Sequence, residues 1–289
     1  ASDLTVECDG SGNVAELNAW LAANGGASAS DSCSSVTWSN DFSAVSDQCG
    51  ATGSVTVTFT ATDDCGNSET TSATFTIQDT TEPTISISAS DLTVECDGSG
   101  NLTQLNDWLA ANGGASASDS CSSVTWSNDF SAVSDQCGAT GSVTVTFTAT
   151  DDCGNSETTS ATFTIQDTTE PTISISASDL TVECDGSGNL TQLNDWLAAN
   201  GGASASDSCS SVTWSNDFSA VSDACGTTGS VTVTFTATDE CGNLETTSAT
   251  FTIQDTTDPT ISISASDLTV ECDGSGNVAE LNAWLAANG

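Results

Sequence analysis

The chain has 289 residues with 40 aspartates and glutamates but no lysine, arginine or histidine, so its formal net charge is −40. Every carboxylate must therefore be hydrated, hydrogen-bonded to a neutral donor or neutralised by an external cation. Such a charge repels nucleic acid and anionic membranes, and the absence of His, Lys, Arg and Tyr removes most catalytic bases, nucleophiles and anion clamps. We expect no nucleic-acid partner, no membrane insertion in this segment and no enzymatic activity.

An internal repeat organises the chain. The segment ASDLTVECDGSGN begins at Ala1 and returns at Ala89, Ala177 and Ala265, which gives a period of 88 residues. That period has the size of one small domain. The predicted domains are repeat 1 over residues 1–82 (without its first strand), repeat 2 over 83–170, repeat 3 over 171–258, and the beginning of a fourth repeat over 259–289. Since both ends fall inside a repeat, we expect a window of a longer array.

Each repeat is predicted to begin with a short strand and a helix. In repeat 1, Leu4 and Val6 alternate with polar residues, as in a strand. Asn13 is expected to cap the following helix, with Glu16 completing a capping box. One apolar helical face is formed by Val14, Leu17, Trp20 and Leu21.

The remainder of the repeat is predicted to form strands. Their centres lie at residues 36–38, 53–63 and 73–77, and at 85–87 at the start of the next repeat. Threonines alternate with apolar residues in these segments, which suits strands with one wet face. The pattern predicts an all-β fold of tandem β-sandwich repeats with one short helix each. Trp20 and Trp38 are expected in the core.

The cysteines predict disulfides. Each full repeat has four, at positions 8, 33, 49 and 65 of repeat 1, and Cys272 is the thirteenth. No close pair of cysteines is present, which favours disulfides in an oxidising compartment over the alternative of a zinc site.

Strand order suggests a connectivity, although four cysteines allow three. Cys8 and Cys49 are predicted at one pole of the sandwich, and Cys33 and Cys65 at the other. We therefore predict pairing within each repeat, with Cys272 left over. The predicted pairs are Cys8–Cys49, Cys33–Cys65, Cys96–Cys137, Cys121–Cys153, Cys184–Cys225 and Cys209–Cys241.

Three acidic loops recur in every repeat and form a candidate calcium site where repeats join. Hard oxygen ligands from separate loops suit Ca²⁺. The third repeat replaces Asp64 by Glu240 and Glu82 by Asp258, and both changes keep a carboxylate. The alternative is a solvated surface of loop acids. The candidate ligands are Asp31, Asp63, Asp64, Asp79, Glu82, Asp119, Asp151, Asp152, Asp167, Glu170, Asp207, Asp239 and Glu240.

The segments LTVEC, ASASDSC, VTFTATDDCGNSE and IQDTTEPTI resemble the hyalin-repeat-like (HYR-like) domains of large secreted Bacteroidetes surface proteins, including gliding-motility-type adhesins. The resemblance covers the whole repeat. It implies an immunoglobulin-like sandwich, export to the cell surface and an adhesive or filamentous role. It also implies an O-glycosylation motif at Thr80, which recurs at Thr168 and Thr256.

The leading hypothesis is the stalk or shaft of an extracellular adhesin or filament, because repeats that contact only their neighbours form quasi-linear arrays. Its partners would be neighbouring repeats and other copies of the chain. The alternative is a surface-binding module that recognises a glycan or another extended surface through its threonine-rich face.

Overall fold

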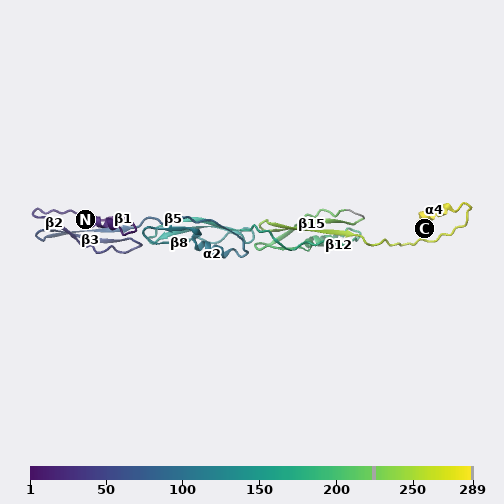
Figure 1. Cartoon of the computed structure of the whole chain (residues 1–289), viewed down its shortest axis with the longest axis horizontal. Helices are drawn as coiled ribbons and strands as arrows, with labels where there is room; N and C mark the ends of the chain where they lie inside the picture. The colour runs from purple at the N-terminus through teal and green to yellow at the C-terminus, as the bar shows by residue number, and fades with distance from the viewer. Residues whose placement is uncertain (223–225, 288–289) are drawn as a thin grey trace. The chain divides into compact units, whose positions relative to one another are not determined.

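The computed structural model describes residues 1–222 and 226–287. Three repeats of the same architecture follow one another (Figure 1). Repeat 1 contains β1 (Leu4–Glu7), α1 (Val14–Ala22), η1 (Asn24–Gly26), β2 (Val36–Asn40), β3 (Gly53–Asp63) and β4 (Ser68–Gln78). Repeat 2 contains β5 (Thr84–Ile87), β6 (Leu92–Glu95), α2 (Leu102–Ala110), η2 (Asn112–Gly114), β7 (Ser116–Ser118), β8 (Val124–Asn128), β9 (Gly141–Asp151) and β10 (Ser156–Gln166).

The third repeat has the same order of elements. It contains β11 (Thr172–Ile175), β12 (Leu180–Glu183), α3 (Leu190–Ala198), η3 (Asn200–Gly202), β13 (Ser204–Ser206), β14 (Val212–Asn216), β15 (Gly229–Asp239) and β16 (Leu244–Gln254). Beyond it, the described residues form only the helix α4 (Val278–Ala286). The contacts group the chain into two units. Ala1–Ile175, Ser204–Ser215 and Thr236–Thr246 form the first, and the rest of repeat 3 with the following segment forms the second.

Each repeat is built on a four-stranded sheet, in the order β1-β4-β3-β2 in repeat 1. The long hairpin β3–β4 is antiparallel, and β1 joins its outer edge in parallel. In repeats 2 and 3 a short second ladder, β5 with β7 or β11 with β13, lies outside this sheet. The predicted tandem β-repeat fold with sandwich-like layers is confirmed.

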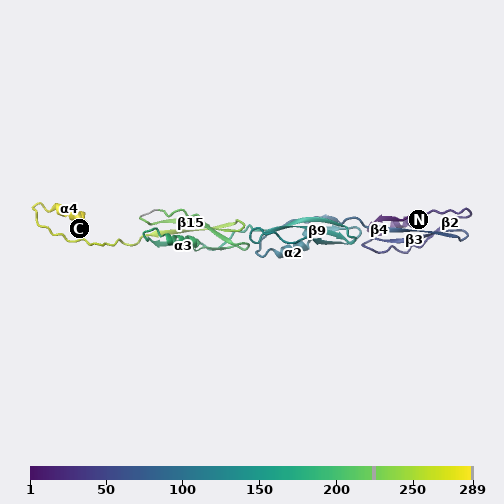
Figure 2. The same cartoon turned by 180° about the vertical axis from the view of Figure 1, so that it is seen from behind.

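The helix covers the inner face of the sheet and completes the core. Trp20 packs edge-on against Phe59 at 5.3 Å between ring centroids and lies 5.6 Å from Phe75. Both phenylalanines are fully buried, and Trp20 is 7% exposed. Figure 2 shows α2 and α3 lying along the sheets of their own repeats. Trp38 is partly buried against the same core.

The predicted capping box at Asn13 is wrong. Asn13 has a left-handed backbone (φ 51°, ψ 38°), and its side chain caps no helical N–H. Its amide instead donates to the Glu7 carbonyl at 2.9 Å and accepts from the Asp9 N–H at 3.2 Å. The buried Asn13 therefore fixes the turn between strand and helix, because asparagine tolerates the left-handed region better than other side chains of its size.

This role of asparagine can be tested with simultaneous Asn13→Ala, Asn101→Ala and Asn189→Ala substitutions. Each change leaves buried backbone groups unpartnered and puts a Cβ-bearing residue without a local hydrogen bond at positive φ, so we expect a loss of about 2–4 kcal/mol per repeat. The matched glycine variants keep the backbone conformation and should lose about half as much. Denaturant unfolding followed by tryptophan fluorescence measures both. Equal losses in the two series would contradict the conformational part of the argument.

Candidate functional site: the junctions between repeats

The strand register places two sets of loops at opposite ends of each repeat. The end of β1, the start of β3 and the end of β4 lie side by side, because Glu7 pairs with Gln78 and Gly53 with Ile77. We call the segment after β1, the segment before β3 and the linker after β4 the far loops. We call the segment before β2 and the β3–β4 turn the near loops, because Val36 pairs with Asp63. Cys8 and Cys49 lie in far loops, and Cys33 and Cys65 in near loops.

The disulfides join the far loops of one repeat to the near loops of the next. Cys8 bonds Cys121 across 113 residues and Cys49 bonds Cys153 across 104 residues, with Cα–Cα distances of 6.0 and 5.2 Å. The next junction repeats the pattern with Cys96–Cys209 and Cys137–Cys241. All four bonds lie within the first unit.

The predicted pairing within each repeat is wrong. Cys8–Cys49, Cys33–Cys65, Cys96–Cys137, Cys121–Cys153 and Cys209–Cys241 do not form, and Cys184–Cys225 involves a residue outside the described ranges. The two ends were assigned correctly, but each sulfur meets the opposite end of the neighbouring repeat rather than its companion at the same end. Among the described cysteines, Cys33, Cys65, Cys184 and Cys272 carry free thiols.

Direct backbone contacts accompany the disulfides. The Ala51 N–H donates to the Cys121 carbonyl at 2.8 Å, and the Ala139 N–H donates to the Cys209 carbonyl at 2.9 Å. Gly50 lies at φ 56° against Cys121, where a Cβ would overlap the Cys121 carbonyl oxygen. Glycine is required here both for the backbone angle and for the close approach of the two chains.

The turn between β9 and β10 holds the linker that precedes its repeat. Asp151 is 5% exposed, and its carboxylate accepts from the Cys153 N–H at 2.9 Å and from the Asn155 side chain at 2.8 Å. The Asn155 amide also donates to the Asp79 carbonyl at 3.2 Å. Asn243 makes the same contact with Asp167 at the next junction. Asp151, which was predicted as a metal ligand, therefore orients the Asn155 amide that binds the linker.

The other face of the linker is held by a glutamate that sequence analysis did not single out. The Glu7 carboxylate accepts from the Thr80 N–H at 2.6 Å and from the Thr80 and Thr81 hydroxyls at 3.1 Å each. These bonds, that from the Thr80 backbone foremost, hold the pKa of Glu7 below its usual value. Glu95 with Thr168 and Glu183 with Thr256 repeat the arrangement. All three predicted glycosylation hydroxyls are thus donors to a glutamate. Only contact across the β-sheet edge reveals this role, because the partners are 73 residues apart.

At each junction two aspartates lie close together beside a disulfide sulfur. Carboxylate oxygens of Asp79 and Asp119 lie within 4.8 Å of each other and of the Cys121 sulfur, and Asp167 and Asp207 do the same beside Cys209. The Oδ2 atoms of Asp79 and Asp167 are buried and accept no hydrogen bond. Burial, followed by the charges of Asp119 and Asp151, raises the pKa of Asp79 above its usual value.

The remaining predicted ligands bind neutral donors. Asp31 accepts from the Cys33 and Ser34 N–H groups, and Asp63 accepts from the Asn67 side chain. The Ser35 hydroxyl donates to Asp64, and the Ser123 hydroxyl donates to Asp152. Asp239 accepts from Asn243, Glu82 lines a separate surface depression, and Glu170 is exposed.

The exchange of aspartate for glutamate in repeat 3 adds a contact across its junction. Glu240 accepts from the Ser211 hydroxyl at 2.6 Å, as Asp152 does from Ser123, but its longer side chain also reaches the Gly138 N–H of repeat 2 at 3.1 Å. These two hydrogen bonds hold the pKa of Glu240 below its usual value. This hydrogen bond joins a near loop of repeat 3 directly to a far loop of repeat 2.

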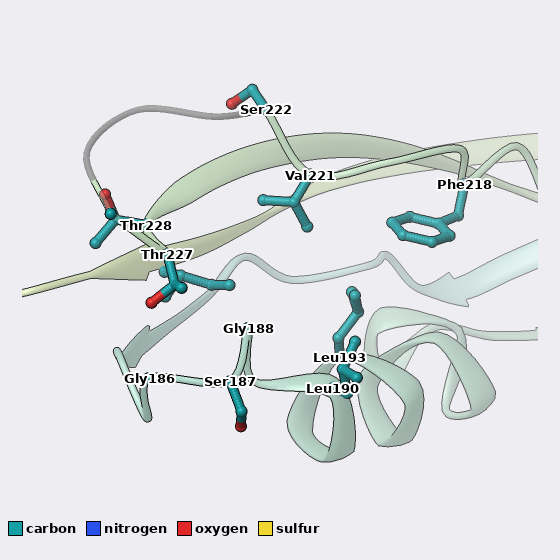
Figure 3. Close-up of a pocket in the computed structure, with 12 residues that line it drawn as sticks. Gly186, Ser187, Gly188, Leu190, Leu193, Phe218, Val221, Ser222, Thr227 and Thr228 are labelled. Atoms are coloured by element: carbon teal, nitrogen blue, oxygen red, sulfur yellow. The ribbon is translucent and has the colours of Figure 1, made fainter.

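A surface groove lies beside the helix in repeats 2 and 3. In repeat 3 it has a volume of about 570 Å³ and lies between the start of α3 and the segment that precedes β15, with Leu190, Leu193, Phe218 and Val221 pointing into it (Figure 3). Repeat 2 has an equivalent groove lined by Leu102, Leu105, Phe130 and Val133. Among the residues that the structure describes, those that line the groove of repeat 3 carry no titratable side chain.

Comparisons with known proteins give no family. No protein-family model and no curated protein matches the chain. Similar solved structures include Drosophila N-cadherin EC1-4 (11% identity, TM-score 0.28), a protocadherin gammaB7 EC3-6 cis-dimer (14%, 0.26) and mouse clustered PcdhgC3 EC1-3 (13%, 0.26). The matches cover 72%, 70% and 72% of this chain and 59%, 58% and 79% of those chains.

These matches are tandem extracellular repeats, and this chain spans little more than half the length of the first ones. No helix in the described ranges is both long and apolar enough to cross a bilayer.

The junction disulfides give a direct prediction. Digestion of the unreduced chain with a protease specific for acidic residues, followed by mass spectrometry, should recover Cys8–Cys121, Cys49–Cys153, Cys96–Cys209 and Cys137–Cys241. A Cys121→Ser variant should lose one cross-link and up to about 5 kcal/mol in the chain-entropy model, whereas Cys33→Ser should change stability little. Recovery of Cys8–Cys49 would contradict the junction geometry.

Proposed function

We propose that this chain is part of the shaft of an extracellular filament or adhesin, and that its junctions are the functional feature. The supporting observation is the pair of disulfides that ties each of the first two repeats to its successor. Stable disulfides belong to oxidising compartments outside the cytosol. The HYR-like resemblance and the surface-exposed location that it implies are part of this proposal, as is the absence of catalysis.

The disulfides define a short covalent path along the array. In repeat 2, Cys153 receives the bond from repeat 1 and Cys137 passes a bond to repeat 3, and these residues lie 16 positions apart on either side of β9. Cys121, which receives the other bond from repeat 1, lies equally far from Cys137, so the path runs through the two segments that flank Cys137, one of which contains the extended strand β9. The rest of the repeat, including the core that α2 forms, lies outside this path.

Force spectroscopy on the full chain tests the shaft. Loss of the fold of oxidised repeat 2 should release no more than about 60 Å, because sixteen residues cannot extend further, whereas 88 reduced residues should release about 300 Å. In a chain with Cys121→Ser and Cys153→Ser, repeat 1 has no bond to repeat 2, so loss of its fold should release about 280 Å from 82 residues without a reductant. Long steps in the oxidised chain would refute a load path through the disulfides.

We include divalent cation binding at the Asp79–Asp119 and Asp167–Asp207 pairs in the proposal. A buried carboxylate oxygen without a donor, beside a second carboxylate, is suited to a hard cation such as Ca²⁺. Cys121 and Cys209 are disulfide-bonded and offer no thiolate, so water and backbone oxygens would complete the coordination. Burial and then the repulsion of neighbouring carboxylates raise the pKa of Asp79 and Asp167, and the cation would neutralise this repulsion.

Calcium dependence can be measured by thermal unfolding. Calcium should raise the melting temperature of the chain relative to chelator, by an amount set by mass action, and Asp79→Asn with Asp167→Asn should abolish the response. Asp107→Ala with Asp195→Ala is the matched control, because repeat 1 already has Ala19 at this exposed position. An unchanged response in the first variant would exclude these pairs as the site.

The same variants have a pH signature. An acid whose pKa is raised by folding binds more protons in the folded state, so without calcium its contribution to stability grows as pH falls through the folded pKa towards the usual value of 3.8. Asn at these two positions should remove that gain, and calcium should suppress it in the unmodified chain.

The alternative function is surface binding through the groove beside the helix, which recurs in repeats 2 and 3. The core tryptophans do not favour it as a stacking platform, since Trp108 and Trp196 are each 7% exposed and pack on phenylalanines. Glycan-array binding that is lost on Leu190→Asp and Leu102→Asp would support it.

A further inference from the structure

The two disulfides at each junction lie in different surroundings. We call Cys8–Cys121 and Cys96–Cys209 the inner bonds, and Cys49–Cys153 and Cys137–Cys241 the outer bonds. All four cysteines of the inner bonds are buried, with exposures of 6% to 8%. Every cysteine of the outer bonds is partly exposed. Because disulfide exchange requires a thiolate to reach a sulfur atom, the outer bonds are the accessible ones.

The packing of neighbouring glycines shows the same contrast. A Cβ on Gly10, two residues after Cys8, would overlap the Ser120 carbonyl oxygen of the next repeat. A Cβ on Gly154, directly after Cys153, would meet no atom within 4 Å beyond its chain neighbours in the part of the chain that the structure describes. A small thiol can therefore reach Cys153 from solvent, whereas the next repeat covers Cys8.

Two carboxylates add an electrostatic barrier at each inner bond. Oxygens of Asp79 and Asp119 lie within 4.8 Å of the Cys121 sulfur, and the second junction repeats the arrangement at Cys209. A thiolate that attacks this bond must approach the carboxylates, and like charges repel more strongly at a partly buried site than in water. A bound cation would cancel this barrier, so its contribution is measured in the presence of a chelator.

A buried hydroxyl group lies beside each outer bond. The Thr52 oxygen lies 3.3 Å from the Cys49 sulfur, and the Thr140 oxygen lies 3.2 Å from the Cys137 sulfur. In the oxidised junction the Thr52 hydroxyl donates to the Cys49 carbonyl at 2.7 Å. Rotation about its C–O bond would direct the proton to a thiolate on Cys49. A hydrogen bond to an anionic sulfur stabilises it, so Cys49 is suited to leave when Cys153 is attacked.

We infer that a small thiol such as glutathione opens the outer bonds first, and that the inner bonds keep each junction closed at that stage. The thiolate attacks the Cys153 sulfur, the bond to Cys49 breaks, and Cys49 leaves as a thiolate with the electron pair of that bond. A second thiolate attacks the glutathione sulfur of the mixed disulfide and releases the Cys153 thiolate with oxidised glutathione. The two protons of the glutathione thiols pass to Cys49 and Cys153.

Opening of the outer bonds changes which segment of repeat 2 carries load. Only Cys96 and Cys121 then bond its neighbours, and they lie 25 positions apart. The segment between them contains α2, whose Trp108 packs in the core, so tension bears on that core. This consequence rests on the proposed shaft function. Force spectroscopy after partial reduction should show a release limited to about 90 Å, against about 60 Å in the oxidised chain.

Timed reduction of the full chain tests the order. Free thiols are blocked, glutathione and chelator are added, and samples are alkylated at intervals before full reduction, labelling with a second reagent and digestion at acidic residues. Mass spectrometry should show both outer bonds opening roughly tenfold or more faster than both inner bonds. Equal rates at either junction, or faster opening of an inner bond, would overturn the inference. The four disulfide pairs, and with them the proposed function, would stand in that case.

The barrier at the inner bonds can be removed at one junction only. In chelator, Asp79→Asn should speed the opening of Cys8–Cys121 several-fold, because one of the two repelling charges is lost. The inner bond of the second junction in the same chain is the matched control and should keep its rate. An unchanged rate for Cys8–Cys121, or an equal gain at both inner bonds, would overturn this part of the inference.

The hydroxyl can be tested in the same way. Thr52→Val should slow the opening of Cys49–Cys153 several-fold without changing the outer bond of the second junction, and Thr52→Ser should restore the rate. A general loosening of the loop would instead speed the opening. A rate for Thr52→Val equal to or above that of the unmodified chain would therefore overturn the role of the hydroxyl.

Discussion

The junction disulfides are the constraint on which the remaining structure depends. Each needs a far loop and a near loop from different repeats to approach within a Cα–Cα distance of 5.2 to 6.0 Å, which lies inside the range that a disulfide spans. Side chains larger than hydrogen at Gly10 and Gly50 would prevent that approach. The recurrence of Gly10 and Gly50 at Gly98 and Gly138 fits the same constraint, because repeats 1 and 2 each offer a far surface to the next repeat.

The electrostatic problem of 40 acids without a cationic side chain is solved largely by neutral donors. Backbone N–H groups, serine and threonine hydroxyls and asparagine amides bind the carboxylates of Glu7, Asp31 and Asp63 and their equivalents. These hydrogen bonds lower the pKa values of all three groups, backbone donors being the largest cause at Glu7 and Asp31 and the Asn67 amide at Asp63. The exception is the buried pair at each junction, where Asp79 and Asp167 keep an oxygen without a donor. Because a buried carboxylate oxygen without a donor suits a cation, we propose cation binding at Asp79 and Asp167 and not at the exposed acids.

In repeat 2, the residues that stabilise the fold differ from those on the proposed covalent path. The aromatic core formed by Trp108, Phe147 and Phe163 stabilises the fold, while the path from Cys137 to Cys153 runs along β9. A repeat can therefore lose its core under load without lengthening the chain by the span of a domain. The linker contacts of Glu95 and Asn155 add hydrogen bonds beside this path.

The sequence alone determined the period, the helix and most strands of each repeat, the all-β class and the assignment of cysteines to two ends, because alternation and composition are local signals that survive without tertiary contacts. The short strands β7 and β13 were not predicted. It also predicted that acidic loops with Asp79 and Asp119 meet where two repeats join, and the two carboxylates do lie close together. It could not determine the disulfide partners, since Cys8 and Cys49 share an end in either connectivity and only the approach of the next repeat distinguishes them. The linker contact of Glu7 and the non-capping role of Asn13 likewise depend on partners across a sheet edge or a turn. Tertiary structure decided these features because their energies arise from surfaces that meet only when one folded repeat packs on another.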